Sequence, residues 1–84
     1  MYKNKSTYQL NNICGKKIAE IRLKRIPKTS QRMLAEMLQL EGLDIDKNAV
    51  QRIEAGARFV SDIELKIISK VLNISCDELL KSEI

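Results

Sequence analysis

Four side chains between residues 47 and 52 carry groups that pair with the edges of nucleic-acid bases: Lys47, Asn48, Gln51 and Arg52. Arginine and lysine pair with O6 and N7 of guanine, and asparagine and glutamine pair with N6 and N7 of adenine. In a helix, positions i, i+1, i+4 and i+5 lie on one face, and no acidic residue interrupts this one. The pattern therefore predicts either a helix that reads bases in a DNA major groove or an ordinary solvated polar face.

The same stretch carries an apolar face that would hold the polar face in position. Its apolar residues fall on the opposite side of the helix: Ala49, Val50 and Ile53. Asp46 can cap the start of the helix, and Gly56 can adopt the left-handed conformation that ends it. We therefore expect a helix of about three turns from Asp46 to Ala55.

Charge is unevenly distributed along the 84 residues, whose formal net charge is +4. Residues 1–32 hold nine basic residues and one acidic residue, which gives +8, whereas residues 33–84 hold six basic and ten acidic residues, which gives −4. A chain of this length forms one domain with a modest core. A basic end would orient the molecule on a polyanion, although a basic tail without function gives the same count.

Cysteine and histidine usage limits the chemistry of the chain. Cys14 and Cys76 stand where apolar residues are expected, and histidine is absent. We read both cysteines as reduced core thiols rather than as a disulfide. Two thiolates alone do not complete the ligand set of a tetrahedral zinc ion. No cysteine has an evident base, and no glycine-rich phosphate loop or close carboxylate pair is present, so we expect no metal, no cofactor and no enzyme.

The chain shows no sign of export or membrane insertion. Residues 1–12 are polar and lack the apolar segment of a signal peptide, and no run approaches the ~18 apolar residues that a membrane span requires. We therefore expect a cytoplasmic protein. A core this small also leaves little room for a small-molecule pocket.

Two further helices are predicted before the polar stretch. The first follows Asn11 or Asn12, either of which could cap it. It ends at about Arg25, because Pro27 lacks an amide hydrogen and disfavours a helical residue before it. The second runs from the capping residue Ser30 to about Glu41. Gly42 then supplies a stop, and three apolar residues can cover the gap before the next helix: Leu40, Leu43 and Ile45.

Two capped helices are predicted after Gly56. Ser61 and Glu64 have the spacing of a capping box, and Ser75 and Glu78 repeat it. We expect the connector residues Phe59 and Val60 to close one side of the core. The helix after Ser61 is apolar over a wide arc: Ile63, Leu65, Ile68, Val71 and Leu72. Five helices and no credible strand predict an all-α domain.

Four groups of residues in this order carry a resemblance to a known family: Gly15-Lys16-Lys17-Ile18 with Arg22, Ser30-Gln31-Arg32-Met33-Leu34-Ala35, Val50-Gln51-Arg52-Ile53-Glu54-Ala55-Gly56, and residues 72–80. Together they resemble the phage repressor and Cro family of helix-turn-helix proteins, also called the xenobiotic-response-element family. The resemblance implies a five-helix, lambda-repressor-like domain over residues 13–80. Residues 1–12 would then be a basic polar arm or lead-in, and residues 81–84 a tail.

The resemblance also implies roles for individual residues. The positions that reach base edges are Lys47, Asn48, Gln51 and Arg52, and those placed for the phosphate backbone are Lys28, Gln31, Arg32 and Arg58. Glu54 would pair with Arg22 at the edge of the core, the alternative being two separate surface charges. The turn through residues 26–30 is about two residues longer than the family's usual spacing. The connection through residues 43–45 is also longer than usual, which leaves the pose of the predicted recognition helix open. Asn73 stands where glycine is frequent, and asparagine also tolerates the left-handed conformation.

The resemblance implies a transcription regulator that binds double-stranded DNA, acting as a homodimer on a palindromic operator and repressing by occupying it. Candidate residues for the dimer surface are Ile84, Leu79, Leu80, an exposed Ile67, Met33 and Met37. The alternative is an antitoxin-like or partner-regulating interaction module with no DNA site of its own.

Overall fold

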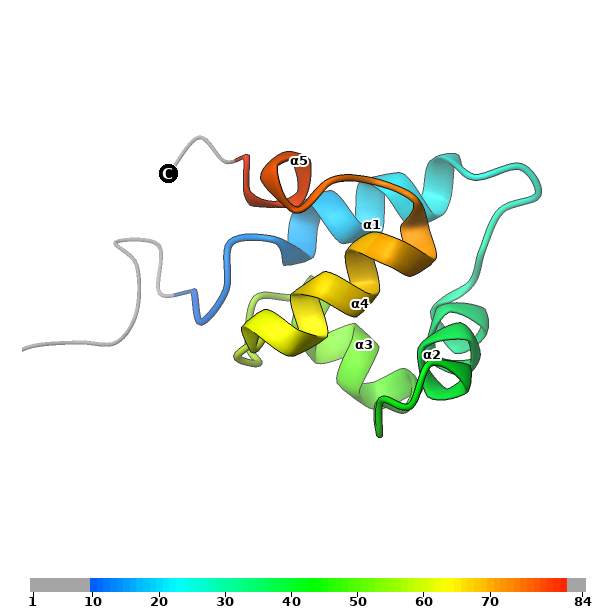
Figure 1. Cartoon of the computed structure of the whole chain (residues 1–84), viewed down its shortest axis with the longest axis horizontal. Coiled ribbons are helices and arrows are strands. Elements are labelled where there is room, and N and C mark those ends of the chain that lie inside the picture. Colours follow the sequence, from blue (N-terminus) through cyan, green and yellow to red (C-terminus); the bar gives the residue numbers. More distant parts are fainter. Residues whose placement is uncertain (1–9, 82–84) are drawn as a thin grey trace, which may run out of the picture.

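The computed structural model describes residues 10–81 and consists there of five helices without a strand, which confirms the all-α prediction (Figure 1). The helices are α1 (Gly15–Lys24), α2 (Gln31–Leu40), α3 (Lys47–Glu54), α4 (Asp62–Leu72) and α5 (Cys76–Leu80). Residues 1–9, which make up most of the expected arm, and the dimer candidate Ile84 lie outside the described residues.

Side-chain caps start four of the five helices. The capping oxygens of Ser30, Asp46, Ser61 and Ser75 each accept a hydrogen bond from the backbone N–H three residues later, over 2.8–3.1 Å. Each bond satisfies one of the amides that a helix start leaves without an internal partner. Glu64 completes a capping box by accepting from the N–H of Ser61. Glu78 instead places its carboxylate 3.2 Å from Lys81 Nζ. The caps predicted at these four positions and the capping box predicted at Ser61 are confirmed, whereas the second capping box, predicted at Ser75, does not form.

Left-handed residues end three of the helices. Gly42, Gly56 and Asn73 have φ angles of +95°, +78° and +55° and follow α2, α3 and α4. After α3, Gly56 N–H donates to Ile53 O over 2.9 Å, and Ala57 N–H donates to Arg52 O over 2.9 Å. These are the two bonds of a Schellman motif, and α2 and α4 end in the same way. The predicted stops are confirmed, including the one that uses asparagine in place of glycine.

Helix α1 begins later than expected. It starts at Gly15 rather than directly after Asn11 or Asn12, because residues 13 and 14 form a bend before the first helical turn. The side chain of Asn12 still accepts from the N–H of Gly15 over 2.8 Å. At the other end α1 stops at Lys24, in agreement with the expected effect of Pro27, and the Ile26–Pro27 peptide is cis.

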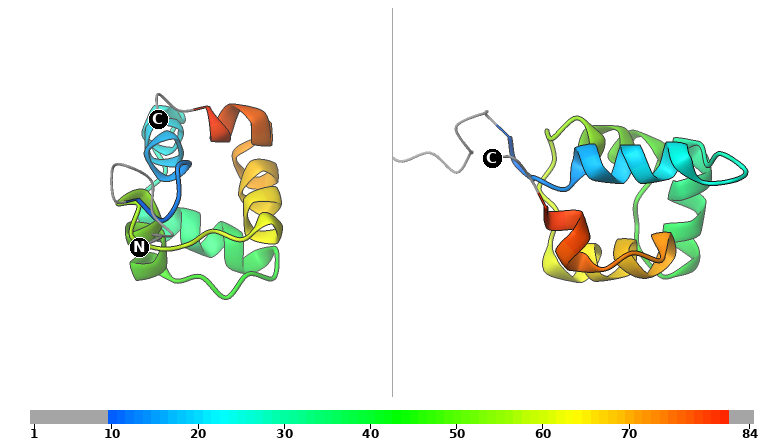
Figure 2. Two further views of the ribbon diagram at one scale, coloured as in Figure 1. Left: turned by 90° about the vertical axis from the view of Figure 1, so that its left-hand side faces the viewer. Right: turned by 90° about the horizontal axis from the view of Figure 1, so that it is seen from above.

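The helices enclose the core in a closed ring of contacts (Figure 2). Helix α3 packs against α1 and α2, α4 packs against α2 and α5, and α5 packs back against α1. The buried apolar residues that fill the ring are Cys14, Ile18, Leu34, Ala35, Leu38, Ile45, Ala49, Val50, Ile53, Ile68, Leu72 and Leu79. Each helix therefore contributes at least one fully buried side chain to a single core.

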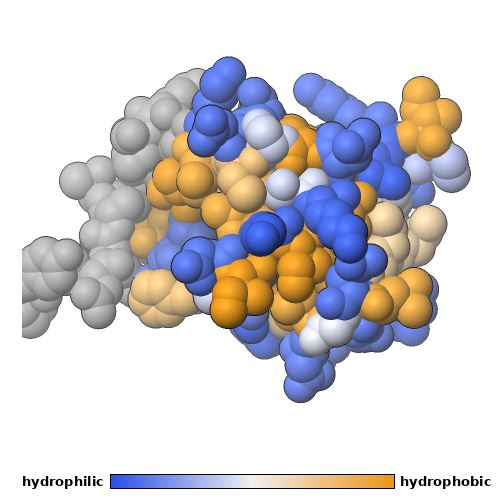
Figure 3. Space-filling view, in the orientation of Figure 1, coloured by the Kyte–Doolittle hydropathy of each residue, from blue (hydrophilic) through white to orange (hydrophobic). Residues whose placement is uncertain are grey.

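Three apolar residues that we expected to pack on the core are exposed instead. Leu40, Phe59 and Ile63 are 87%, 60% and 68% exposed and do not cover the core. Leu40 and Ile63 each lie two positions from an inward-facing residue of the same helix, which turns them to the opposite side. Figure 3 shows hydrophobic surface over α4 between hydrophilic side chains.

Some of the residues proposed for a dimer surface are also buried. Leu79 is 0% exposed because it plugs the core beneath α5, and Ile67 is partly buried against the core rather than exposed. Both expectations were wrong, whereas Met33 and Leu80 are each 42% exposed. Cys14 is buried and Cys76 is only partly buried, and both are free thiols. None of the helices in residues 10–81 is long and apolar enough to span a membrane.

Candidate nucleic-acid interface

Helix α3 separates its side chains into two faces. Ala49, Val50 and Ile53 are buried against α1 and α2. The four donor-bearing side chains are all exposed: Lys47, Asn48, Gln51 and Arg52. The buried face sets the orientation of the helix, so the exposed face projects these four side chains away from the domain together.

An ion pair ties α3 to α1. Arg22 donates to the Glu54 carboxylate through Nε over 2.7 Å and through Nη2 over 2.8 Å, and it donates through Nη1 to Thr29 O over 3.0 Å. The hydrogen bond to Glu54 raises the pKa of Arg22, and burial of the guanidinium opposes that rise. Two parallel charge-assisted bonds between planar groups fix both distance and orientation. The structure thus brings together the two residues that the family resemblance paired.

Gln31 joins this cluster instead of standing free at the surface. It is the first residue of α2, it is half-buried, and its Nε2 donates to Glu54 Oε1 over 2.9 Å. Glu54 therefore receives bonds from α1 and from α2 while it belongs to α3. Hydrogen bonds to this one carboxylate therefore link the three helices around the candidate interface.

The remaining predicted phosphate contacts fall into two kinds. Arg58 pairs with Glu64 over 3.1 Å and 3.2 Å and also donates to Phe59 O. The hydrogen bond from Arg58 lowers the pKa of the Glu64 carboxyl group. Lys28 and Arg32 are exposed and form no ion pair with a carboxylate of residues 10–81, and the same is true of Lys47 and Arg52. These four exposed cations are thus available to an anion from outside the domain.

The long connection between α2 and α3 is anchored at its end. Ile45 is fully buried, and its carbonyl accepts from Gln39 Nε2 over 2.9 Å. Leu43 packs partly buried against the core. The sequence left the pose of α3 open because of this long connection. The hydrogen bond from Gln39 to Ile45 O, which helps to fix that pose, was not predicted. The only sign of this bond in the sequence was the polar side chain of Gln39 near the end of a predicted helix.

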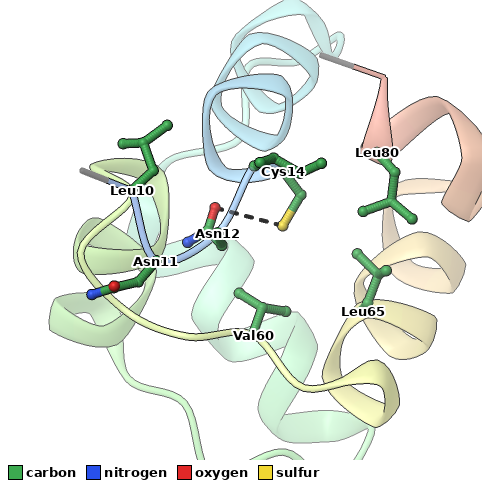
Figure 4. A pocket seen from close by; sticks show the side chains of 8 residues that line it. Leu10, Asn11, Asn12, Cys14, Val60, Leu65 and Leu80 are labelled. Atoms are coloured by element: carbon green, nitrogen blue, oxygen red, sulfur yellow. Dashed lines mark hydrogen bonds between the residues drawn. The ribbon is translucent and has the colours of Figure 1, made fainter. Parts of the chain in front are cut away.

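An open groove lies on another side of the domain (Figure 4). Its volume is about 340 Å³, and its apolar lining comes from Leu10, Ile13, Val60, Leu65 and Leu80 together with the Cys14 thiol. None of the residues predicted to contact DNA lines this groove. Burial raises the pKa of Cys14, so the thiol stays protonated and is a poor nucleophile. Within residues 10–81, no group of acidic, histidine or cysteine side chains could hold a metal ion.

Comparison with known proteins gave one match. A family model described as helix-turn-helix matches residues 18–79, which is most of the chain. Neither the comparison with curated proteins nor that with solved structures found a match. The matched region begins inside α1 and ends in α5, so it contains both α2 and α3 and the connection between them.

Proposed function

Since the chain belongs to the helix-turn-helix family and is a DNA-binding regulator, we propose that it binds a palindromic operator as a homodimer and represses transcription by occupying it. The observation that carries the proposal is the two-sided α3. Its apolar face is buried and tied to α1 and α2 at Glu54, and its opposite face exposes four base-pairing side chains. We also propose that it acts in the cytoplasm.

Base readout falls to the exposed face of α3. A helix fits the B-DNA major groove, where each base pair presents its own pattern of donors and acceptors. Arg52 and Lys47 suit guanine, and Asn48 and Gln51 suit adenine. Each good two-bond contact discriminates against a wrong base by about 1–3 kcal/mol. A site read by these four side chains therefore contains both guanine and adenine.

Phosphate contacts orient the domain on the duplex. Lys28 and Arg32 are exposed cations near the start of α2, where the helix dipole also favours an anion. Gln31 uses one N–H for Glu54, and the second N–H of its amide remains for a phosphate oxygen. Arg58 holds Glu64 through Nη1 and Nη2, which leaves Nε as a donor. These four residues contribute to affinity for any sequence rather than to specificity.

A homodimer would supply the specificity that one short helix lacks. Two copies related by a twofold axis would place their recognition helices in half-sites about 34–36 Å apart, and the operator would share that symmetry. Leu80 and Met33 are the exposed apolar candidates for the contact between the copies. The two lie on different helices, so a substitution at each distinguishes two possible dimers.

The decisive experiment is selection of bound duplexes from a random library by the full chain. We expect a palindromic motif rich in guanine and adenine contacts. An anisotropy titration of the selected duplex at two salt concentrations then tests the phosphate contacts. Three phosphate-neutralising cations per protomer would give a slope of log K against log salt of about −5 for a dimer. A chain that selects no duplex and shows no salt-sensitive binding would refute the proposal and favour a protein-interaction module.

A further inference from the structure

Residues 10–12, which we name the strap, lie across the end of α3 and the turn that follows it (Figure 4). Asn11 donates through its backbone N–H to Gly56 O and through Nδ2 to Ala57 O, each over 2.8 Å. Asn12 donates through Nδ2 to Ile53 O over 3.1 Å and to Arg58 O over 2.7 Å. The strap thus binds one backbone carbonyl in the last turn of α3 and three in the turn that follows it. It lies before the region that the family model matches.

The strap and the start of α1 also contact α3 directly. A Cβ atom at Gly15 would overlap the carbonyl oxygen of Ile53, so α1 begins against the backbone of α3. Leu10 packs on Gly56, where a Cβ atom would lie 2.5 Å from Leu10 Cδ2. The last carbonyls of a helix lack partners inside the helix, and partners from outside hold its final turn in shape. In α3 the turn that follows supplies N–H partners to Arg52 O and Ile53 O. The strap, more than 40 residues earlier in the chain, adds Asn12 Nδ2 as a second donor to Ile53 O and also holds the turn at Arg58 O.

We propose that the strap positions the second turn of the recognition helix for base readout, with Asn12 as the positioning residue; this inference rests on the proposed function. Gln51 and Arg52 immediately precede Ile53, whose carbonyl Asn12 holds. Lys47 and Asn48 lie at the other end of α3, where Asp46 caps the helix. Loss of the strap's bonds therefore disturbs the bases read by Gln51 and Arg52 and spares those read by Lys47 and Asn48.

Asn12→Asp separates this role from the cap of α1. The aspartate keeps the oxygen that accepts from Gly15 N–H, but it has no N–H for Ile53 O and Arg58 O. Ser75→Ala is the matched control because it removes a helix cap from α5, which packs against α1 and α4. Arg52→Ala identifies which base positions of the selected duplex depend on the end of α3.

The test compares base preference at each position of the selected duplex for these variants. We expect Asn12→Asp to weaken preference about tenfold at the positions that Arg52→Ala relaxes, and to leave the positions read from the start of α3 unchanged. Ser75→Ala should relax no single position, since general destabilisation lowers the amount of folded protein and leaves its base preference intact. Preference retained at the Arg52-dependent positions, or lost equally at all positions, would overturn the inference.

The test also allows for a variant that does not fold, and it distinguishes failure of the strap's role from failure of the proposed function. If Asn12→Asp does not fold, Asn11→Ala replaces it, because that variant removes only the bond to Ala57 O and leaves the backbone bond and Asn12 in place. We expect it to shift the same positions by about threefold, and no shift would count against the inference. A wild-type chain that selects no duplex refutes the proposed function and the strap's role with it. A wild-type chain that selects a duplex which the strap variants read normally refutes the strap's role alone.

Discussion

Replacing the Arg22–Glu54 pair with apolar residues should reveal whether its charges stabilise the fold or only constrain it. The side chains are 10% and 6% exposed, so Arg22→Met leaves a carboxylate with little access to water, and Glu54→Leu leaves a guanidinium in the same position. Breaking a buried pair in this way costs about 3–5 kcal/mol. A domain of 84 residues has a total stability of about 4–12 kcal/mol, so each single variant should lose a large part of it.

The double variant Arg22→Met with Glu54→Leu should be more stable than either single variant. Apolar residues of similar volume often replace a buried ion pair at no cost or with a gain of about 1–4 kcal/mol. Here part of that gain is offset, because Gln31 loses its acceptor and Thr29 O loses its donor. We therefore expect the double variant to fall within about 2 kcal/mol of the wild type.

Urea unfolding followed by far-ultraviolet circular dichroism measures all four proteins of this cycle. Independent charges would make the two losses add. A double variant whose loss equals the sum of the single losses would therefore refute the reasoning and show two charges that act separately.

Three more outcomes are expected. In each half-site of the selected duplex, Arg52→Ala should cost about 1–3 kcal/mol and relax one base position. Lys28→Ala should weaken all duplexes alike and, because the dimer loses one cation per protomer, reduce the salt slope by about 2; anisotropy titrations separate the two. The folded-state pKa of Glu64 is lowered by Arg58, so its contribution to stability is present above the pKa of an unfolded glutamate and is lost as the pH falls through the lower folded value. Unfolding measured against pH should therefore show an acid loss that Arg58→Ala reduces. Cys14 should react with iodoacetamide far more slowly in the folded protein than in urea, as mass spectrometry would detect, because it is buried and its pKa is raised.

Apart from the start of α1, helix boundaries and caps could be predicted from the sequence because their causes are local. Ser30, Asp46 and Ser61 act on amides three residues away, and Gly56 ends α3 through its own backbone conformation. Such signals lie within one helical turn and do not depend on how the helices pack together. The order of these local signals was enough to indicate the family and the all-α fold.

Contacts across the chain were harder to predict. Asn12 was read only as a helix cap, and its bonds to Ile53 O and Arg58 O span 41 and 46 residues. Gln31 was expected at a phosphate, and its bond to Glu54 depends on the approach of α2 to α3. The exposure of Leu40 likewise depends on where its helix turns away from the core. Periodicity shows that a helix has an apolar side, but it does not show which neighbour covers each residue.

The closed ring of helix contacts has a consequence for biosynthesis. Helix α5 leaves the ribosome after the other four described helices, yet it packs against α1, and Leu79 fills the core to which α1 contributes. A nascent chain without α5 therefore exposes an unsealed apolar interior along its first four helices. We therefore expect a chain truncated shortly before Leu79 to leave its core open and to be degraded rather than to act as a weaker regulator.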